Sequence, residues 1–353
     1  LGINLNKLET VEEKKFIKII QEYPILVKNS VDCLSDFMLS SEDIKLKRDN
    51  LLFFTRIILK NWEHLSPKIK KEVEDGKDFF LDNLFQYAYH GIQNKELFQN
   101  CIKITRNTLE LTLDKTFIKY NYSKSSKKKI AFMSDYLTRR HSVFKDRHKV
   151  IEYLSKKEDF EVYLITLEGL RGIEQYEAFR HVKEHIILRN MNVSNIVRHL
   201  RSYEFDKLVF CEIGMDPIMK KVAHFRIANK QYNTWGHSDT SGFEEIDYFV
   251  SSELYELPYE ESKNHYTEEL ILQKGMCTSY VNPTSCYKLN LPRSFYGLSD
   301  YEKIILCPQS LFKIHPDFDE YIFRILKENN NCSLVFLDNI EKKFKMYERW
   351  NLK

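Results

Sequence analysis

The sequence predicts an α/β protein preceded by an all-helical region, and three observations support this prediction. Up to about residue 120, apolar residues follow helical spacing. From residue 130, short apolar runs alternate with helical segments, which is typical of a mostly parallel sheet with right-handed crossovers. A second alternation begins near residue 300, after a stretch punctuated by Pro and Gly. We therefore expect a helical domain over 1–120, a linker over 121–129, a first α/β domain over 130–299 and the start of a second over 300–353.

Composition limits the class of protein. A chain of 353 residues with 43% hydrophobic and 14% aromatic residues can build two packed domains. The net charge of +3 argues against a nucleic-acid-binding protein. Seven scattered cysteines without a CxxC pair predict neither a disulfide framework nor a zinc site, and they suit a reducing compartment. The sequence shows no run of about 18 apolar residues and no signal peptide, so we expect a soluble cytoplasmic protein without a membrane span.

The helical region is predicted in order from caps and apolar faces. A capping box at 10–13 starts a helix that ends at Pro24. Further helices are expected around 51–58, from Ser66-Pro67, around 80–88, and from Asn94 to Leu109. The spacing shows no repeat of about 34 to 45 residues, so we predict no solenoid. We expect this region to act as a scaffold or a partner surface.

The α/β region starts after a polar, basic run at 121–129, which we interpret as a solvated linker rather than a nucleic-acid patch. Apolar runs predict strands at 130–133, 160–165, 186–188, 208–211, 231–235, 246–250, 270–272, 304–306 and 333–337. Helical spacing predicts helices around 143–154, 176–179, 196–200, 218–225 and 317–326.

The stretch Cys307–Pro316 is the first candidate for ligand binding. It follows the strand at 304–306 and leads to a helix entry at His315-Pro316-Asp317. Loop donors and helix N-termini at the carboxyl ends of strands hold ligand phosphates in open α/β sheets. Lys313 is therefore a candidate phosphate contact, and an ordinary surface lysine is the competing interpretation.

Two other polar stretches follow predicted strands. In Ser134–Ser142, His141 could serve as a general base or as a donor to phosphate, because imidazole titrates near neutrality. The same loop is basic, which suits either an anionic ligand or a solvated helix face; its cations are Arg139, Arg140, Lys145 and Arg147. In Trp235–Gly242, two glycines flank small hydroxyl residues, which allows a close approach of backbone to ligand or simply a tight turn.

A third turn, Glu212–Pro217, is expected to shape the cleft. Glu212 and Asp216 lack the further ligands that a metal site needs. Two α/β domains that open onto one cleft suggest group transfer from an activated phosphate ester. Lys313 could stabilise the leaving diphosphate, and His141 could act on the acceptor hydroxyl or amide.

Taken together, these stretches resemble one family in order and spacing, over roughly residues 129 to 340. The matching segments are Ser134-Asp135 with His141-Ser142, Ile213–Pro217, Trp235–Gly242 with Ile246–Tyr248, Tyr266–Leu270, and Cys307–Lys313. The family is that of the O-GlcNAc transferases and the bacterial HMW-type adhesin N-glucosyltransferases. The resemblance implies a GT-B fold of two Rossmann-like domains and a UDP-sugar bound in the cleft. It also implies inverting transfer to protein Ser/Thr or Asn, without a metal or other cofactor.

The resemblance also implies roles for individual positions. His141 matches the histidine that lines the cleft and is a proposed base, and Lys313 matches the lysine that contacts the diphosphate. The turn that contains Gly236, His237, Thr240 and Gly242 matches the loop facing donor and acceptor. Beside Lys313, Ser310 stands where the animal enzymes have glutamine, and Gln309 lies one residue earlier; both are predicted nucleotide contacts. The N-terminal helices are similar to those of the bacterial enzymes rather than to tetratricopeptide repeats.

The sequence thus predicts a UDP-sugar-dependent protein glycosyltransferase whose partners are the UDP-sugar and an acceptor protein or peptide. The family's later nucleotide-binding segment lies beyond the sequence, so we expect this piece by itself to transfer sugar weakly or not at all. Two alternatives remain open. One is a sugar-nucleotide epimerase or another GT-B enzyme with a small-molecule acceptor. The other is a non-catalytic module that binds a partner.

Overall fold

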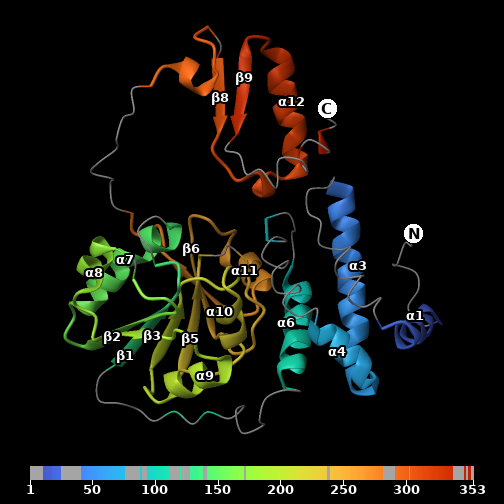
Figure 1. Cartoon of the computed structure of the whole chain (residues 1–353), viewed down its shortest axis with the longest axis vertical. Coiled ribbons are helices and arrows are strands. Elements are labelled where there is room, and N and C mark those ends of the chain that lie inside the picture. The colour runs from blue at the N-terminus through green and yellow to red at the C-terminus, as the bar shows by residue number, and fades with distance from the viewer. Residues whose placement is uncertain are drawn as a thin grey trace.

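The structure is a computed structural model. It describes residues 11–24, 41–75, 88–89, 94–110, 120, 122, 128–137, 141–170, 172–236, 239–280, 291–301, 303–336, 346 and 349–350. Three parts follow one another along the chain in Figure 1: a group of helices, a large parallel sheet with helices on both faces, and a small C-terminal α/β unit. This is the fold class that the sequence predicts.

The N-terminal part is helical over the described residues. Its helices are α1 (Val11–Glu22), α3 (Ser41–Lys60), α4 (Pro67–Asp75) and α6 (Lys95–Glu110), with the short 3-10 helix η2 (Trp62–His64). The helix predicted around 80–88 lies almost entirely outside the described residues. Phe16 of α1 packs edge-on against Phe54 of α3, with ring centroids 5.9 Å apart, so the apolar faces predicted from spacing meet in a common core.

Among the described residues, seven parallel strands form one sheet in the order β3-β2-β1-β4-β5-β6-β7. The strands are β1 (Lys128–Met133), β2 (Phe160–Thr166), β3 (Glu184–Ile187), β4 (Lys207–Phe210), β5 (Lys230–Thr234), β6 (Tyr248–Ser252) and β7 (Glu269–Gln273). The chain moves outward from β1 to β3, and then returns to place β4 on the other side of β1. The strand order therefore reverses between β1 and β4.

Side-chain alternation along the strands sorts the core into two layers. On β1, Ile130 and Phe132 face the layer that contains α7 (Ser142–Ser155) and α8 (Ile173–Phe179). Ala131 and Met133 face the layer that contains α9 (Val193–Arg201) and α10 (Pro217–Val222). This alternation is what a strand covered on both faces requires.

The N-terminal helices share that second layer. One cluster of buried apolar residues runs from Phe54 and Leu97 of the helices to Phe210 of the sheet. Polar contacts reinforce it, because Arg106 of α6 pairs with Glu245 at 3.2 Å and Thr105 bonds to the buried His224 at 3.1 Å. The helical region is thus built into the sheet domain rather than tethered beside it.

Some element boundaries differ from those predicted, among them those of β1, β6 and α10. β1 begins at Lys128, because Lys128 and Lys129 pair with the start of β2 and extend the strand into the expected linker. β6 begins at Tyr248 rather than at 246, because Ile246 closes a turn onto Phe243 and the Asp247 carboxylate accepts the Gln231 N–H at 2.7 Å. α10 ends at Val222, short of the predicted 225.

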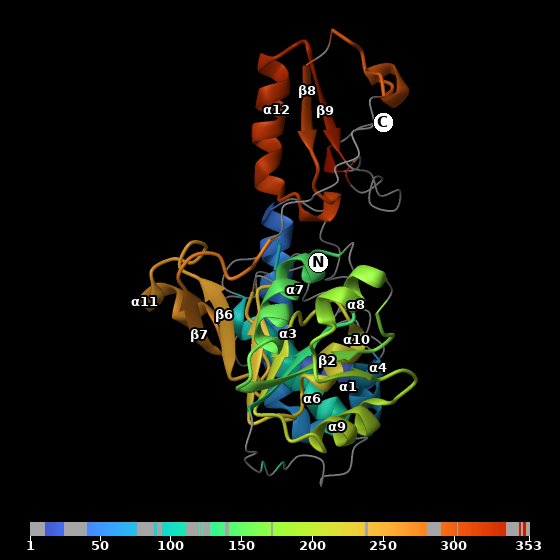
Figure 2. The ribbon, with the colours of Figure 1, turned by 90° about the vertical axis from the view of Figure 1, so that its left-hand side faces the viewer.

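The C-terminal unit pairs β8 (Lys303–Cys307) with β9 (Cys332–Phe336) in parallel, across α12 (Asp319–Glu328). The predicted helix entry is a 3-10 turn, η7 (Pro316–Phe318), capped by the His315 ring, and α12 starts only at Asp319. In Figures 1 and 2 the arrowheads of β8 and β9 point toward the larger part of the molecule. None of the described helices is long and apolar enough to cross a membrane.

Candidate functional site

The strand order fixes where a ligand site is expected. In an open parallel sheet, ligands bind beyond the carboxyl ends of the strands at the point where the order reverses. Here that point lies between β1 and β4. The two stretches that follow these strands, 134–142 and 211–217, both stood out in the sequence, and we name them the switch-point loops.

Tyr136 joins the two switch-point loops. Its hydroxyl donates to the Met215 carbonyl oxygen at 3.4 Å, and its ring contacts that of His141 at a tilt of 38°, with centroids 4.6 Å apart. Burial, then the charges of Glu212, Asp216 and Asp135, raise the pKa of this phenol. The sequence reasoning passed over Tyr136, although its position three residues after a buried strand was a signal.

His141 caps the N-terminus of α7. Its Nδ1 accepts the Val143 backbone N–H at 3.2 Å, and burial lowers its pKa although Asp146 opposes that shift. A backbone N–H can only donate, so in the neutral ring Nδ1 carries the lone pair and Nε2 carries the hydrogen. This tautomer makes Nε2 a hydrogen-bond donor. Of the two roles predicted for His141, the geometry favours the donor over the base.

Glu212 lies under the same loops and is fully buried. One carboxyl oxygen accepts the Met215 N–H at 3.3 Å, and the other has no partner among the residues that the structure describes. Burial raises the pKa of Glu212 to about 8, so the group is mainly protonated at neutral pH. In the described part of the chain, no three His, Cys, Asp or Glu side chains gather as metal ligands.

Gly236 brings the loop after β5 against the switch point. A Cβ at this position would lie 2.4 Å from the Cys211 carbonyl oxygen and 2.9 Å from the Glu212 Cβ. Glycine is therefore required here for a close approach, as the sequence suggested, and the neighbour is the loop after β4. His237, predicted beside it, lies outside the described residues.

The second half of that loop, residues 239–242, is held by hydrogen bonds to Glu268. We name this segment the β5 loop. Thr240 is fully buried, and its hydroxyl donates to the Glu268 carboxylate at 2.6 Å. The other Glu268 oxygen accepts the Ser241 N–H at 2.9 Å and the Ser241 hydroxyl. Thr240, predicted as a donor-sugar contact, thus uses its hydroxyl inside the protein.

The helical region supports the β5 loop. The Asn94 amide donates to the Asp239 carboxylate at 3.0 Å. Gly242 has φ of +78°, and a Cβ there would lie 2.9 Å from the Phe98 carbonyl carbon. Glycine meets both demands, since it adopts the left-handed region without a steric penalty and leaves room for α6. The structure places Gly242 against α6 rather than in an open site.

Lys313 lies on the 3-10 turn η6 (Leu311–Lys313), just after β8. Its ammonium lies 4.7 Å from the ring centroid of Tyr89, and burial lowers its pKa. Gln309 and Ser310 are exposed, and the Gln309 side-chain oxygen accepts the Ser310 N–H at 3.0 Å. The structure thus places Lys313 beside Tyr89 of the helical region and His141 beside Tyr136.

Arg147, a further cation of the basic loop, is buried rather than exposed on a solvated helix face. Arg147 is only 4% exposed, and its Nη1 donates to the Cys277 carbonyl oxygen at 2.8 Å. Arg139 and Arg140 lie outside the described residues. The burial of Arg147 was not predictable from spacing, because its partner is 130 residues away in the chain.

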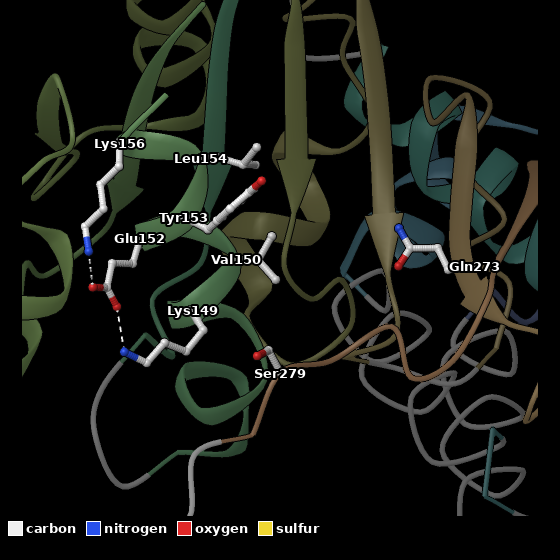
Figure 3. A pocket seen from close by; sticks show the side chains of 8 residues that line it. All are labelled: Lys149, Val150, Glu152, Tyr153, Leu154, Lys156, Gln273 and Ser279. Carbon is white, nitrogen blue, oxygen red and sulfur yellow. Dashed lines mark hydrogen bonds and ion pairs between the residues drawn. The ribbon is translucent and has the colours of Figure 1, made fainter. Parts of the chain in front are cut away.

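An open pocket lies along α7. It encloses about 730 Å³ between α7 and the segment after β7. Figure 3 shows Val150, Tyr153 and Leu154 directed away from the side of α7 that carries the linked Lys149, Glu152 and Lys156, with Gln273 across the opening. None of the residues predicted for the site lines this pocket.

The chain was compared with known proteins at three levels. No protein-family model matches it, and no curated protein matches it. Among solved structures, it is similar to a mutant of the O-GlcNAc transferase of Thermobaculum terrenum, with a TM-score of 0.55. The chain has a GT-B-type fold. The match covers 96% of this chain and 68% of the other at 15% sequence identity, so the likeness is one of fold.

Proposed function

We propose that this protein transfers a sugar, GlcNAc or a hexose, from a UDP-sugar to a Ser/Thr or Asn side chain of a protein, with inversion. The observation that carries the proposal is the placement of the matching motifs. The stretches that start at Ser134, Cys211, Trp235 and Pro308 each follow the carboxyl end of a parallel strand, in two sheets. Ligands of open α/β sheets bind at those ends.

In the proposed reaction the acceptor oxygen or nitrogen attacks the anomeric carbon of the sugar, and the bond from that carbon to the diphosphate breaks. Negative charge grows on the leaving UDP, and Lys313 supplies a fixed cation for it. His141 donates from Nε2 and thereby orients a substrate oxygen rather than removing a proton. The acceptor proton leaves with the departing diphosphate or passes to solvent.

The proposal includes no metal and no other cofactor, since Lys313, in a loop at the strand ends, would supply the positive charge that a metal ion could otherwise provide. It also places the protein in the cytoplasm. The described cysteines are free thiols, which agrees with a reducing compartment. The fold likeness to an O-GlcNAc transferase supports a sugar-nucleotide donor and a protein acceptor.

Intact-protein mass spectrometry tests the proposal. The full-length protein is incubated with an acceptor peptide library and, separately, with UDP-glucose and UDP-GlcNAc. We expect a mass gain of one sugar on peptide and release of UDP in equal amount. Free epimerised sugar or UDP without labelled peptide would identify a small-molecule enzyme instead. If no UDP-sugar raises the Tm, the protein is a binding module and the proposal fails.

A further inference from the structure

Three aromatic side chains gather at the carboxyl edge of the sheet, next to the switch-point loops. Trp235 follows β5, Tyr255 follows β6 and Tyr280 follows β7. The Trp235 and Tyr255 rings are tilted by 30° with centroids 5.0 Å apart, and Tyr255 is close enough to Tyr280 to raise its pKa electrostatically. Tyr255 and Tyr280 are 39% and 54% exposed, so they present aromatic surface to solvent.

Asp146, the fifth residue of α7, supplies the acidic group of this surface. It is 5% exposed, and it lies close enough to the Tyr280 hydroxyl to raise the pKa of that phenol. Its Oδ1 has no partner among the described residues. The neighbouring Arg147 donates from Nη1 to the Cys277 carbonyl oxygen, and its Nε and Nη2 also have no partner among the described residues. A buried carboxylate oxygen without a donor is costly, and a cationic ligand would satisfy it.

This cluster adjoins the residue proposed to contact substrate. The charge of Asp146 raises the pKa of His141, which places the carboxylate near the imidazole. Exposed Glu253, two residues before Tyr255, adds a second carboxylate at the same strand end. Aromatic faces and carboxylates both attract a side-chain cation, and Trp is the strongest of the rings.

We propose that Trp235, Tyr255, Tyr280 and Asp146 form a subsite that binds a Lys or Arg side chain of the acceptor polypeptide, close to the residue that receives the sugar. The proposal rests on the proposed function, because it assumes a polypeptide acceptor. The open pocket along α7 supports a polypeptide. It begins at Ser279, next to Tyr280, and offers the apolar side chains of Val150, Tyr153 and Leu154 to a continuing chain (Figure 3).

Matched acceptor peptides test the subsite on the full-length protein. The peptides differ only near the acceptor residue, where one carries Lys and its partner carries norleucine, which has the same stem without the charge. We expect the Lys peptide to have a KM lower by about tenfold, the scale of one cation–π contact combined with a charge-assisted hydrogen bond. Asp146→Asn should remove that preference, so that the two peptides have nearly equal KM values.

Tyr255→Leu is the second variant, since its exposed ring can be removed without opening the core. It should reduce the preference in the same direction even if Asp146→Asn fails to fold. Tyr176→Leu, on exposed α8, is the matched control and should keep the full preference. Equal KM values for the two peptides in the unaltered protein would overturn the subsite. So would a preference that survives Asp146→Asn and Tyr255→Leu. Failure to label any peptide would instead count against the proposed function.

Discussion

The β5 loop and the switch-point loops both lie at the carboxyl ends of strands, yet their polar groups are in opposite states. In the β5 loop, Thr240 and Ser241 direct their hydroxyls to Glu268, whose two oxygens are both occupied. Near the switch point, Glu212 and Asp146 each keep a buried oxygen without a partner among the described residues. The polar groups at this edge of the sheet therefore divide into those with partners inside the protein and those without a partner among the described residues.

The comparison has a physical basis. A buried carboxylate that accepts several donors stabilises the fold, whereas an unpartnered one costs free energy that only a ligand or protonation can recover. His141 takes part in the fold through one ring nitrogen, because its Nδ1 accepts the Val143 N–H. Polar residues that follow strands in the sequence can therefore be either paired or unpaired in the folded protein. Four experiments separate the two cases.

The largest change in stability at a fixed pH is expected in the β5 loop, whose polar groups already have partners. Glu268→Gln replaces a carboxylate by an amide that cannot accept all of the present donors, so the free energy of unfolding should fall by about 3 kcal/mol. Urea unfolding at pH 7 measures it. Glu244→Gln is the control, because Glu244 forms an exposed pair with Lys103 at 3.5 Å and should cost less than about 1 kcal/mol. Equal losses in the two variants would remove the distinction between the loops.

Lys313→Ala should reduce sugar transfer by more than about tenfold, the scale expected when one charge-stabilising donor is removed. Its stability should change little, because Lys313 is only partly buried. Initial rates of transfer measure the effect. Lys327→Ala, on the exposed side of α12, is the control and should retain the full rate. Near-normal transfer by Lys313→Ala would exclude the lysine from the donor site.

His141 offers a test between donor and base. A glutamine side chain can donate a hydrogen bond but cannot take up a proton at neutral pH. If His141 acts as a donor, His141→Gln should retain about tenfold more transfer than His141→Ala. Steady-state kcat for both variants measures this. Equal, severe losses in the two, together with loss of the acid limb of the pH profile, would assign a general base instead.

The last test uses the pH dependence of stability. The pKa of Glu212 is raised from 4.5 to about 8 by burial, so the folded state holds a proton that the unfolded state has lost across this window. Its contribution is fully present below pH 4.5 and falls as pH rises toward 8, by at most about 1.4 kcal/mol per pH unit. Glu212→Gln should abolish that fall.

The measurement is Tm against pH for both proteins, and the difference between the curves is the readout. His224 acts in the opposite direction, because burial lowers its pKa to about 3 and its contribution is lost as pH falls below 6.5. Both proteins contain His224, so its effect cancels in the difference. Parallel curves from pH 5 to 8 would show that Glu212 ionises normally.

Much of the fold was predictable from the sequence because its signals are local. Apolar runs placed β2, β4, β5 and β7 to within about two residues, and the 3.6-residue spacing placed α7 and α9. Two of the errors, at β6 and β1, arise where a distant group intervenes. β6 starts late because Asp247 bonds to Gln231, and β1 starts early because Lys128 pairs with Phe160. Local pattern cannot anticipate such partners.

The candidate site was predictable as a set of loops and not as a set of contacts. The sequence by itself determined that His141, Gly236 and Lys313 follow strands, since strand ends are set by local apolar runs. Only the tertiary structure decided which of the neighbouring polar groups have hydrogen-bond partners within the protein. Glu268 reaches Thr240 from 28 residues away, and Tyr280 reaches Asp146 across an even longer stretch. Hydrogen-bond satisfaction depends on these long-range partners, because packing of the sheet and helices brings them together.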